Sequence, residues 1–434
     1  MTMPLRALIV FCGLLAGAHF LRFGTVWECL AALLPALGAL FPRLVPRPLM
    51  ALALVAGFWL WTDQAAGLIA TRLQFDMPYL RLAAILGAVC LLHVAGLVLL
   101  LGRAGHRLLG PVDSTTWAQS AAMLLVGAAM IAATVTAPFP LLLGERFLPG
   151  SSPAWIGFFA MYAGVVVRHM LTGSAPRVRA FIWSLFSLVF FGQLALGLGG
   201  MTEFLMTGKL HLPVPALILA GPLYRGEGLF MPILLGVSLL LVGPAWCSHL
   251  CYIGAWDDQL SRLGPKRPRP LPAWAPRVRT GILAGTILVP LALRLAGVTW
   301  AWALGVAVLF GLTGIGIMAL WSRKSGTMVH CTMWCPVGLV NNLVGRILPW
   351  RVRIAPDCTG CGLCARACRY NALTLEDLAR KRPGLSCSLC GDCLPRCPHG
   401  HINLTLAGHT RYARPVFVVL VVALHTIFLA VARI

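Results

Sequence analysis

Eight cysteines in the last quarter of the 434-residue chain fall into two runs with the same spacing. The runs are Cys358-x2-Cys361-x2-Cys364-x3-Cys368 and Cys387-x2-Cys390-x2-Cys393-x3-Cys397-Pro398. Three thiolates on one tight turn can hold three irons of a cube, and the fourth iron needs a cysteine from further away. A zinc ribbon needs four thiolates per metal but not two interleaved runs of four. The spacing therefore predicts two [4Fe-4S] clusters.

The fourth cysteine of each run predicts how the two clusters share their ligands. In two-cluster ferredoxins this cysteine ligates the cluster of the other run. The prediction is Cys358, Cys361, Cys364 and Cys397 for cluster I, and Cys387, Cys390, Cys393 and Cys368 for cluster II. Gly360, Gly362 and Gly391 would let backbone N–H groups approach the sulfurs. Arg369 stands where the second run has Pro398, which alters the turn after the ligand but not the number of thiols.

Four more cysteines form two pairs, Cys247-Ser-His-Leu-Cys251 and Cys331-Thr-Met-Trp-Cys335-Pro336. On one helical face this spacing separates the Cβ atoms by about 5 to 6 Å, too far for an undistorted disulfide, which needs about 3.5 to 4.5 Å. These paired cysteines could share an iron–sulfur centre, Cu(I) or zinc at the membrane surface. Thiol redox chemistry and a structural role are the alternatives. His249 and His330, beside the thiols, could be ligands or ordinary helix-end histidines.

Composition identifies the elements that must position these thiols. Apolar residues make up 59% of the chain and charged residues 11%, which excludes an ordinary soluble domain. The net charge of +22 is spread over short loops between apolar runs, without a reading helix or an aromatic platform. Nucleic-acid binding is therefore not expected. Basic loops of this kind contact anionic membrane lipids instead.

The expected fold is an α-helical polytopic membrane protein of about eleven transmembrane helices, with a small α+β ferredoxin-like domain for two [4Fe-4S] clusters inserted before the last helix. The predicted helices lie near residues 5–21, 25–42, 48–66, 80–102, 117–139, 153–171, 180–200, 230–246, 279–298, 302–321 and 413–432. The expected domains are a helix bundle of unknown role (1–174), a membrane core with the paired cysteines (175–350), the two-cluster domain (351–408) and a final transmembrane helix (409–434).

The distribution of basic residues predicts the orientation. With the N-terminus inside, most of the 35 Lys and Arg fall on the inner side, as the positive-inside rule requires. We therefore expect a multi-pass protein of a bacterial-type inner (cytoplasmic) membrane, with the ferredoxin-like domain in the cytoplasm. Reduced thiols fit that compartment.

The motifs together resemble the NapH/NosR type of polytopic membrane ferredoxin. The resemblance covers roughly residues 175 to 405, including the segment from Leu212-Pro-Val-Pro to Gly226 and the phrase Gly243-Pro-Ala-Trp-Cys-Ser-His-Leu-Cys-Tyr-Ile-Gly. Tyr252 replaces the proline usual after the first pair, and no outer segment is long enough for the periplasmic flavin-binding domain of the NosR type. The NapH-like form is the closer match. The N-terminal bundle lies outside the resemblance.

The resemblance implies electron transfer between the quinone pool and a respiratory or metalloenzyme partner, with the chain as a candidate quinol-linked oxidoreductase subunit. Alternatives are a metal reductase or metal-centre assembly protein that uses the paired cysteines, and a redox-responsive regulator. A redox partner protein is expected, and quinol is a candidate substrate. The outer segment 201–229 contains His211, Tyr224, Arg225 and Glu227, which are candidates for a quinol site; a capping loop without a ligand is the alternative.

Overall fold

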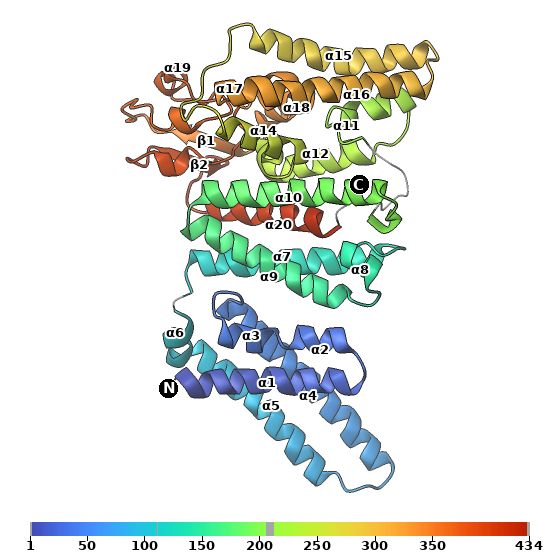
Figure 1. Ribbon diagram of the computed structural model, residues 1–434. Coiled ribbons are helices and arrows are strands. Elements are labelled where there is room, and N and C mark those ends of the chain that lie inside the picture. Colours follow the sequence, from blue (N-terminus) through green and yellow to red (C-terminus); the bar gives the residue numbers. More distant parts are fainter. Residues whose placement is uncertain (1, 111, 205–211, 432–434) are drawn as a thin grey trace. The chain divides into compact units, whose positions relative to one another are not determined.

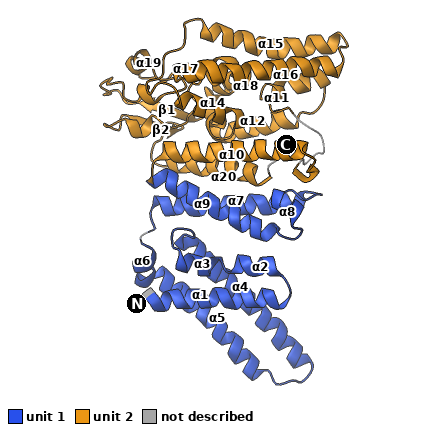
Figure 2. Cartoon of the chain, in the orientation of Figure 1, with its two compact units in different colours: residues 1–172 blue, residues 173–434 orange. Residues whose placement is uncertain are grey.

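The structure is a computed structural model that describes residues 2–110, 112–204 and 212–431. The chain divides into two compact units, residues 1–172 and 173–434 (Figure 2). Unit 1 contains only helices in its described part (Figure 1): α1 (Thr2–Arg22), α2 (Val26–Ala32), α3 (Leu34–Leu40), α4 (Arg47–Gln74), α5 (Leu80–Leu101), α6 (Arg103–Leu109), α7 (Ser114–Thr136), α8 (Leu143–Phe147) and α9 (Ser152–Thr172).

Small residues let the helices of unit 1 pack closely. α4 packs along α5 and α7 along α9, while α1 packs against α2, α3 and α5. A Cβ added to Gly164 would lie 2.6 Å from the Met123 sulfur, and one added to Gly57 would lie 2.6 Å from the His93 ring. Membrane helices associate through such close contacts because lipid removes the hydrophobic drive between them.

The polytopic helical fold is confirmed, with one difference in the first unit. The described part of the chain contains ten helices long and apolar enough to cross a membrane, and each overlaps one of the eleven predicted spans. The remaining prediction, 25–42, is wrong as a single helix, because the segment forms the seven-residue helices α2 and α3. The break falls at Leu33, and Pro35 lies in the first turn of α3, where it cannot donate an N–H to the preceding turn.

Unit 2 contains the expected cysteine-rich domain between membrane helices. Its helices are α10 (Ala175–Leu198), α11 (Leu217–Arg225), α12 (Phe230–Val242), α13 (Trp246–His249), α14 (Tyr252–Arg262), α15 (Ala275–Leu295), α16 (Trp300–Gly316), α17 (Arg323–Ser325), α18 (Pro336–Gly345), α19 (Leu375–Ala379) and α20 (Ala413–Val431). Short 3-10 turns cover Thr202–Phe204, Gly243–Ala245, Ala365–Ala367 and Leu394–Arg396, and π-helical turns cover Ile317–Ser322 and His330–Trp334.

Two strands close the base of the ferredoxin-like domain. β1 (Trp350–Ile354) pairs antiparallel with β2 (Ile402–Leu406), from Trp350 opposite Leu406 to Ile354 opposite Ile402. Both cysteine runs lie between these strands in the sequence. The Trp350 indole donates to the Leu241 carbonyl of α12 (2.9 Å) and packs against Phe417 of α20. The domain is therefore attached at its base to two membrane helices.

Candidate functional site

The two cysteine runs of the ferredoxin-like domain adopt the same local structure. In each run, the residue two after the first cysteine has a positive φ: Gly360 (71°) in one and Leu389 (54°) in the other. Gly362 and Gly391, one residue after the second cysteine, also have positive φ. A leucine in this region is uncommon and strained, so the turn geometry is imposed by its surroundings.

Backbone N–H groups point at the last sulfur of each run. The Ala372 N–H donates to Cys368 Sγ and the His401 N–H to Cys397 Sγ, both at 3.3 Å. Hydrogen bonds of this kind stabilise negative charge on iron–sulfur ligands and tune the reduction potential. The two halves of the domain are thus equivalent in their donors as well as in their cysteine spacing.

A pocket brings together the four thiols expected at cluster II. Cys368 from the first run and Cys387, Cys390 and Cys393 from the second all line the same pocket. Ligands from both runs therefore fit one polynuclear centre. Burial raises the pKa of the Cys368 thiol to about 12. The unliganded thiol is protonated at neutral pH, so iron binding there must release a proton.

The thiols expected at cluster I are more accessible. Cys361 is exposed, Cys358 and Cys397 are half-buried, and Cys364 is buried. Burial raises the pKa of the Cys364 thiol, and the neighbouring Cys397 and Cys358 thiolates raise it further. The fourth cysteine of the second run therefore lies close to the first run, as the interleaved assignment requires.

The backbone of the paired cysteines differs from the sequence prediction. Neither pair lies on one helical face, because a helix ends between its two members. Cys247 belongs to α13 and Cys331 to a π-helical turn, whereas Cys251 and Cys335 have extended backbones just before α14 and α18. In both pairs a wide i→i−5 bond closes the turn, from Cys251 N–H to Trp246 O (3.1 Å) and from Cys335 N–H to His330 O (2.8 Å).

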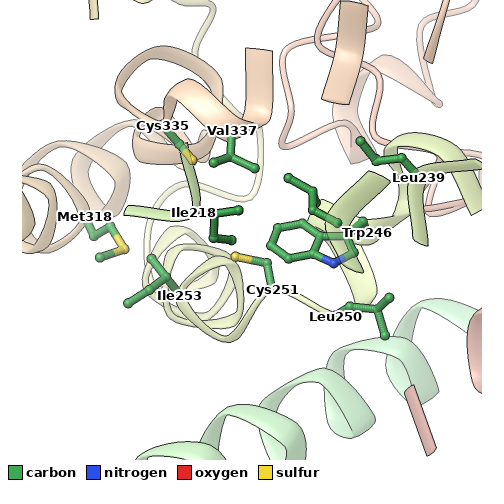
Figure 3. Packing of buried hydrophobic residues seen from close by; sticks show 10 residues of the cluster. Ile218, Leu239, Trp246, Leu250, Cys251, Ile253, Met318, Cys335 and Val337 are labelled. Atoms are coloured by element: carbon green, nitrogen blue, oxygen red, sulfur yellow. The ribbon is translucent and has the colours of Figure 1, made fainter. Parts of the chain in front are cut away.

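The structure places the four paired thiols in one buried region. Burial raises the pKa of the Cys331 thiol, and Asp257 and the other three paired thiols add to the effect, so all lie within electrostatic reach. Cys251 and Cys335 belong to the apolar cluster around Ile218 and Trp246 (Figure 3). Burial also raises the pKa of the Cys335 thiol, while the first N–H groups of α18 lower it.

Each pair is followed by a residue whose side chain hydrogen-bonds to the first cysteine of the other pair. Six residues after Cys251, the Asp257 carboxylate Oδ2 accepts the Cys331 N–H at 2.9 Å. Six residues after Cys335, the Asn341 Nδ2 donates to Cys247 Sγ at 3.0 Å. The two halves therefore hold each other's first cysteine in place.

A glycine three residues after each pair allows this packing. A Cβ on Gly254 would lie 2.9 Å from the Cys247 carbonyl oxygen and 2.6 Å from the Trp183 ring, and one on Gly338 would lie 2.8 Å from the Cys331 carbonyl oxygen. Real Cβ atoms do not approach backbone oxygens so closely. Only glycine, which has no Cβ, lets the first turns of α14 and α18 pack this closely against the backbone of the preceding cysteine turns.

Replacing Gly254 or Gly338 by alanine should therefore destabilise unit 2, by about 1 to 3 kcal/mol for overpacking against backbone. The measurement is the thermal unfolding of the full-length chain in detergent. Gly281→Ala in α15 is the matched control, because its added methyl would meet nothing within 4 Å. Equal unfolding temperatures for all three variants would contradict the close-approach argument.

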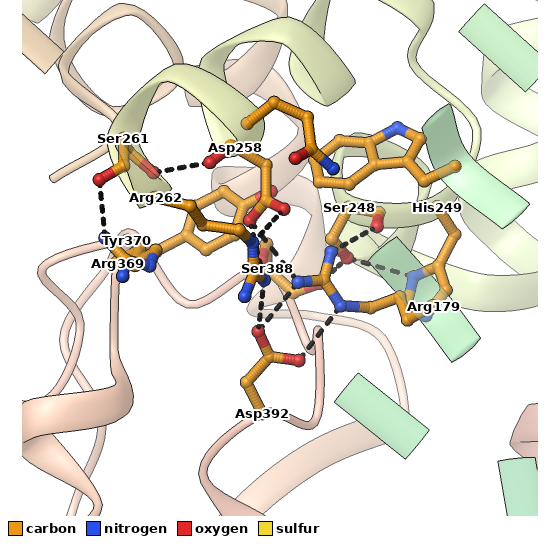
Figure 4. A network of polar contacts seen from close by, with 12 residues as sticks. Arg179, Ser248, His249, Asp258, Ser261, Arg262, Arg369, Tyr370, Ser388 and Asp392 are labelled. Carbon is orange, nitrogen blue, oxygen red and sulfur yellow. Dashed lines mark hydrogen bonds and ion pairs between the residues drawn. The ribbon is translucent and has the colours of Figure 1, made fainter. Parts of the chain in front are cut away.

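A buried charge network attaches the ferredoxin-like domain to the membrane helices (Figure 4). The Arg179 guanidinium of α10 donates to both oxygens of Asp392 (2.9 and 2.7 Å), to the Ser248 carbonyl (3.1 Å) and to Asp258 (3.4 Å). Arg262 donates to both oxygens of Asp258 at 2.6 and 3.1 Å. Burial alone would raise the pKa of Asp258, but the Arg179 and Arg262 guanidinium groups hold it below its usual value.

Arg369, which stands where the second run has Pro398, connects the ferredoxin-like domain to the membrane core. Its Nη1 donates to the carbonyls of Ser261 (2.8 Å) and Gly326 (2.7 Å), and its own carbonyl accepts the Met328 N–H (2.8 Å). A proline here, as at Pro398, could make neither side-chain bond. The first run is therefore adapted to contact the membrane core.

The cluster II cysteines pack on the core that holds the paired cysteines. Cys368, Cys387, Cys390 and Cys331 surround a buried set formed by Trp183, Ala255, Met328, Tyr370 and Ala372. The Tyr370 hydroxyl donates to the Cys247 carbonyl (3.4 Å), and the Asn342 Nδ2 donates to the Cys387 carbonyl (3.0 Å). Packed side chains and two hydrogen bonds thus connect the two sets of thiols.

Of the other candidates, His249 and Tyr224 have local hydrogen-bond partners, whereas the two ring nitrogens of His330 have none among the described residues. His249 Nδ1 lies 3.0 Å from Ser248 Oγ and 3.2 Å from the Ala245 carbonyl, and His330 packs against Gly314. The Tyr224 hydroxyl donates to the Val298 carbonyl (2.7 Å), and His211 lies outside the described residues. In the described ranges no group of three or more His, Cys, Asp or Glu side chains could hold a single metal ion.

Sequence reasoning missed an internal repeat that includes these supporting residues. α10 and α15 both begin with Ala-Pro-Arg-Val-Arg, and each repeat ends in C-x3-C-x2-G followed by Asp257-Asp258 or Asn341-Asn342. The second arginine of each pentapeptide, Arg179 or Arg279, is buried. Arg279 donates to Asn342 (2.7 Å) as Arg179 does to Asp258. Aligning the chain with itself would have revealed the signal.

Comparison with known proteins identifies iron–sulfur families in two segments. The family described as 4Fe-4S binding domain matches residues 228–270, which include Cys247 and Cys251, and the 4Fe-4S dicluster domain matches residues 357–401, which include both cysteine runs. No solved structure matches the chain.

Two curated proteins are similar to the chain. The putative electron transport protein YccM of Escherichia coli (strain K12) is 24% identical over 227 residues, which cover 46% of this chain and 59% of YccM. The methylamine utilization ferredoxin-type protein MauN of Paracoccus denitrificans (strain Pd 1222) is 30% identical over 210 residues, which cover 43% of this chain and 71% of MauN. The chain thus spans less than two thirds of YccM and more than two thirds of MauN.

Proposed function

The chain belongs to the NapH/NosR type of polytopic membrane ferredoxins, and from this premise we propose that it carries electrons between the quinone pool and a respiratory or metalloenzyme partner. It is a multi-pass membrane protein that transfers electrons through 4Fe-4S clusters. The donor, the acceptor and the use of quinol are the proposed part. The observation that carries the proposal is the direct packing of the cluster II cysteines on the membrane core.

The proposed ligands are the eight cysteines of the two runs, divided between clusters I and II as the spacing predicts. The shared pocket supports cluster II, and the electrostatic contact of Cys364 with Cys397 and Cys358 supports cluster I. When bound, each cluster supplies a site that accepts and releases one electron. The chain contributes the thiolates, the N–H donors to Cys368 and Cys397, and a buried environment around cluster II.

The paired cysteines are proposed to hold a further polynuclear iron–sulfur centre. One tetrahedral zinc with Zn–S bonds of about 2.3 Å would hold its sulfurs roughly 3.8 Å apart, and in the described residues no group of three or more His, Cys, Asp or Glu side chains could hold one metal ion. A polynuclear centre needs thiolates further apart. Three buried polar atoms beside these thiols also have no hydrogen-bond partner among the described residues: Arg279 Nε, Asn341 Oδ1 and Asp257 Oδ1.

Arg279 is proposed to offset the negative charge of such a centre. It is 5% exposed and lies close enough to Cys335, Cys247 and Cys331 to interact with their thiolates. Its partner Asn342 is neutral, whereas Arg179 in the other repeat is neutralised by Asp258 and Asp392. In the described residues Arg279 therefore forms no ion pair, and the one carboxylate that acts on these thiols is that of Asp257, beside Cys331. The amino-terminal ends of α14 and α18, which begin directly after Cys251 and Cys335, add positive potential.

The partner protein is proposed to bind near cluster I. Cys361 is exposed in that set, and the cluster II set faces the membrane core.

We also propose that the ferredoxin-like domain lies in the cytoplasm, on the inner side of a bacterial inner membrane, which the basic loop around Arg267 supports. An Arg267→Cys variant should then resist a membrane-impermeant thiol reagent in intact cells and react in inverted vesicles. Labelling of position 267 in intact cells would reverse the orientation.

A quinol assay tests the proposed function. The full-length chain, purified without oxygen and placed in lipid nanodiscs, is mixed with a soluble quinol or quinone analogue while the absorbance and EPR signals of the clusters are followed. We expect electrons to pass between the analogue and the clusters in at least one direction. A Cys393→Ser variant should show no such transfer. Clusters that respond to dithionite but to neither quinol nor quinone would contradict the proposal.

A further inference from the structure

Unit 1 contains a polar pocket at one end of its helices. The pocket opens to its surroundings, and Arg47, Thr116, Gln119, Arg168, Pro42 and Pro46 are among its lining residues. Arg47 is the first residue of α4, Thr116 lies in the first turn of α7, and Arg168 lies near the end of α9. The pocket is therefore at the membrane-surface end of three long apolar helices rather than midway along them.

Two buried side chains of this pocket have polar atoms without partners. Arg47 is 6% exposed, and its Nη2 donates to the Leu101 carbonyl at the end of α5 (2.5 Å), whereas its Nε donates to no atom of the described residues. Gln119 is fully buried, and its Nε2 donates to the Arg43 carbonyl (3.0 Å) while its Oε1 accepts from none of them. One donor and one acceptor thus remain, and leaving such groups unsatisfied is costly.

The charge of the pocket is positive. Arg47 and Arg168 both line it, and Asp113 is the acidic side chain nearby. Asp113 offsets part of the Arg168 charge, but its Oδ1 accepts both the N–H and the hydroxyl of Thr116 at 2.8 Å, which fixes it as the cap of α7. A guanidinium group that is buried and only partly paired favours an anion with several oxygen acceptors.

We propose that this pocket binds a phosphate ester, and that its occupant in the membrane is the head group of an anionic phospholipid such as phosphatidylglycerol. The phosphate oxygens would accept from Arg47 and Arg168, and a glycerol hydroxyl would donate to Gln119 Oε1. The position at the helix ends matches the depth of lipid phosphates, and basic pockets between membrane helices bind such head groups. The N-terminal bundle then anchors the protein to anionic lipid.

The test is lipid retention by the full-length chain. The protein is delipidated in detergent, incubated with phosphatidylglycerol or phosphatidylcholine, and examined by native mass spectrometry. We expect selective retention of phosphatidylglycerol, reduced about tenfold or more by Arg47→Gln or Arg168→Gln. Arg81→Gln is the control, because Arg81 is an exposed arginine at the opposite end of the α4–α5 hairpin. Gln119→Leu should weaken the preference for phosphatidylglycerol over phosphatidic acid.

Soluble glycerol phosphate distinguishes the two sources of a phosphate ester. If it binds and phosphatidylglycerol does not, the phosphate site stands and its occupant is a soluble ester. Equal retention of both lipids, or retention unchanged in Arg168→Gln, would overturn the proposal. If Arg47→Gln fails to accumulate because the Leu101 contact is lost, the half-buried Arg168 still decides the outcome.

Discussion

Replacing Arg179 by methionine should remove most of the folded protein from membranes. The substitution leaves Asp258 and Asp392 buried without their shared guanidinium group, and breaking a buried ion pair from one side costs about 3 to 5 kcal/mol. The measurement is the yield of iron-loaded chain together with its unfolding in denaturant. Arg177→Met is the matched control, two residues earlier in the same helix and exposed.

A second substitution separates lost pairing from lost packing. Adding Asp392→Asn to Arg179→Met removes one of the stranded charges, so part of the stability should return. If Asp392→Asn instead destabilised the Arg179→Met variant as much as it destabilises the native chain, that result would contradict the network. The two sites are in contact, so their effects should not add.

The same network has a defined dependence on pH. Because the folded-state pKa of Asp258 is lowered, its stabilising contribution is complete above the unfolded pKa of about 3.9 and is lost as pH falls through the folded value. The stability difference between the native chain and Arg179→Met should therefore be constant near neutral pH and shrink below about pH 4.

The second large effect concerns the paired cysteines, which should act as one unit. If the four thiolates hold one centre, Cys247→Ser or Cys331→Ser alone leaves an open coordination position and should remove most of the iron bound there. The double variant should then be scarcely worse than either single one. Iron content and EPR of the purified chain measure this effect, and the clusters of the two runs should survive because their eight ligands lie elsewhere.

Cys90→Ser is the control for the thiol substitutions, since Cys90 is a half-buried cysteine of unit 1. Independent redox pairs would instead give electron-transfer defects that combine in the double variant. Full metal content and full electron transfer in the serine variants of all four paired cysteines would leave these residues with a structural role only.

The motif with the most regular spacing was the most informative part of the sequence. Ligand spacing directly reflects the geometry of a cube, so the ferredoxin-like domain and the family were predicted correctly. Hydropathy likewise placed ten long helices, because a membrane span needs a continuous apolar run. The segment from Val26 to Leu40 is the exception, because it is apolar but forms two seven-residue helices on either side of Leu33.

The supporting residues could not be predicted from local patterns. Arg179 looked like one basic residue among many near a helix end, because its partners Asp258 and Asp392 lie 79 and 213 positions away. Spacing also could not show that a helix ends within each cysteine pair. Pro336 hints at this break after the second pair, whereas Tyr252 gives no such signal after the first. The internal repeat was the available clue.

The iron content of the full-length chain, purified without oxygen, shows whether the cysteines hold iron–sulfur clusters. We predict about eight irons in the two clusters of the ferredoxin-like domain, additional iron at the paired cysteines, and negligible zinc. Cys361→Ala should lower the total by about four irons, since it removes a ligand of cluster I alone. A chain that contains zinc in place of iron, or whose iron content is unchanged in Cys361→Ala, would contradict this prediction.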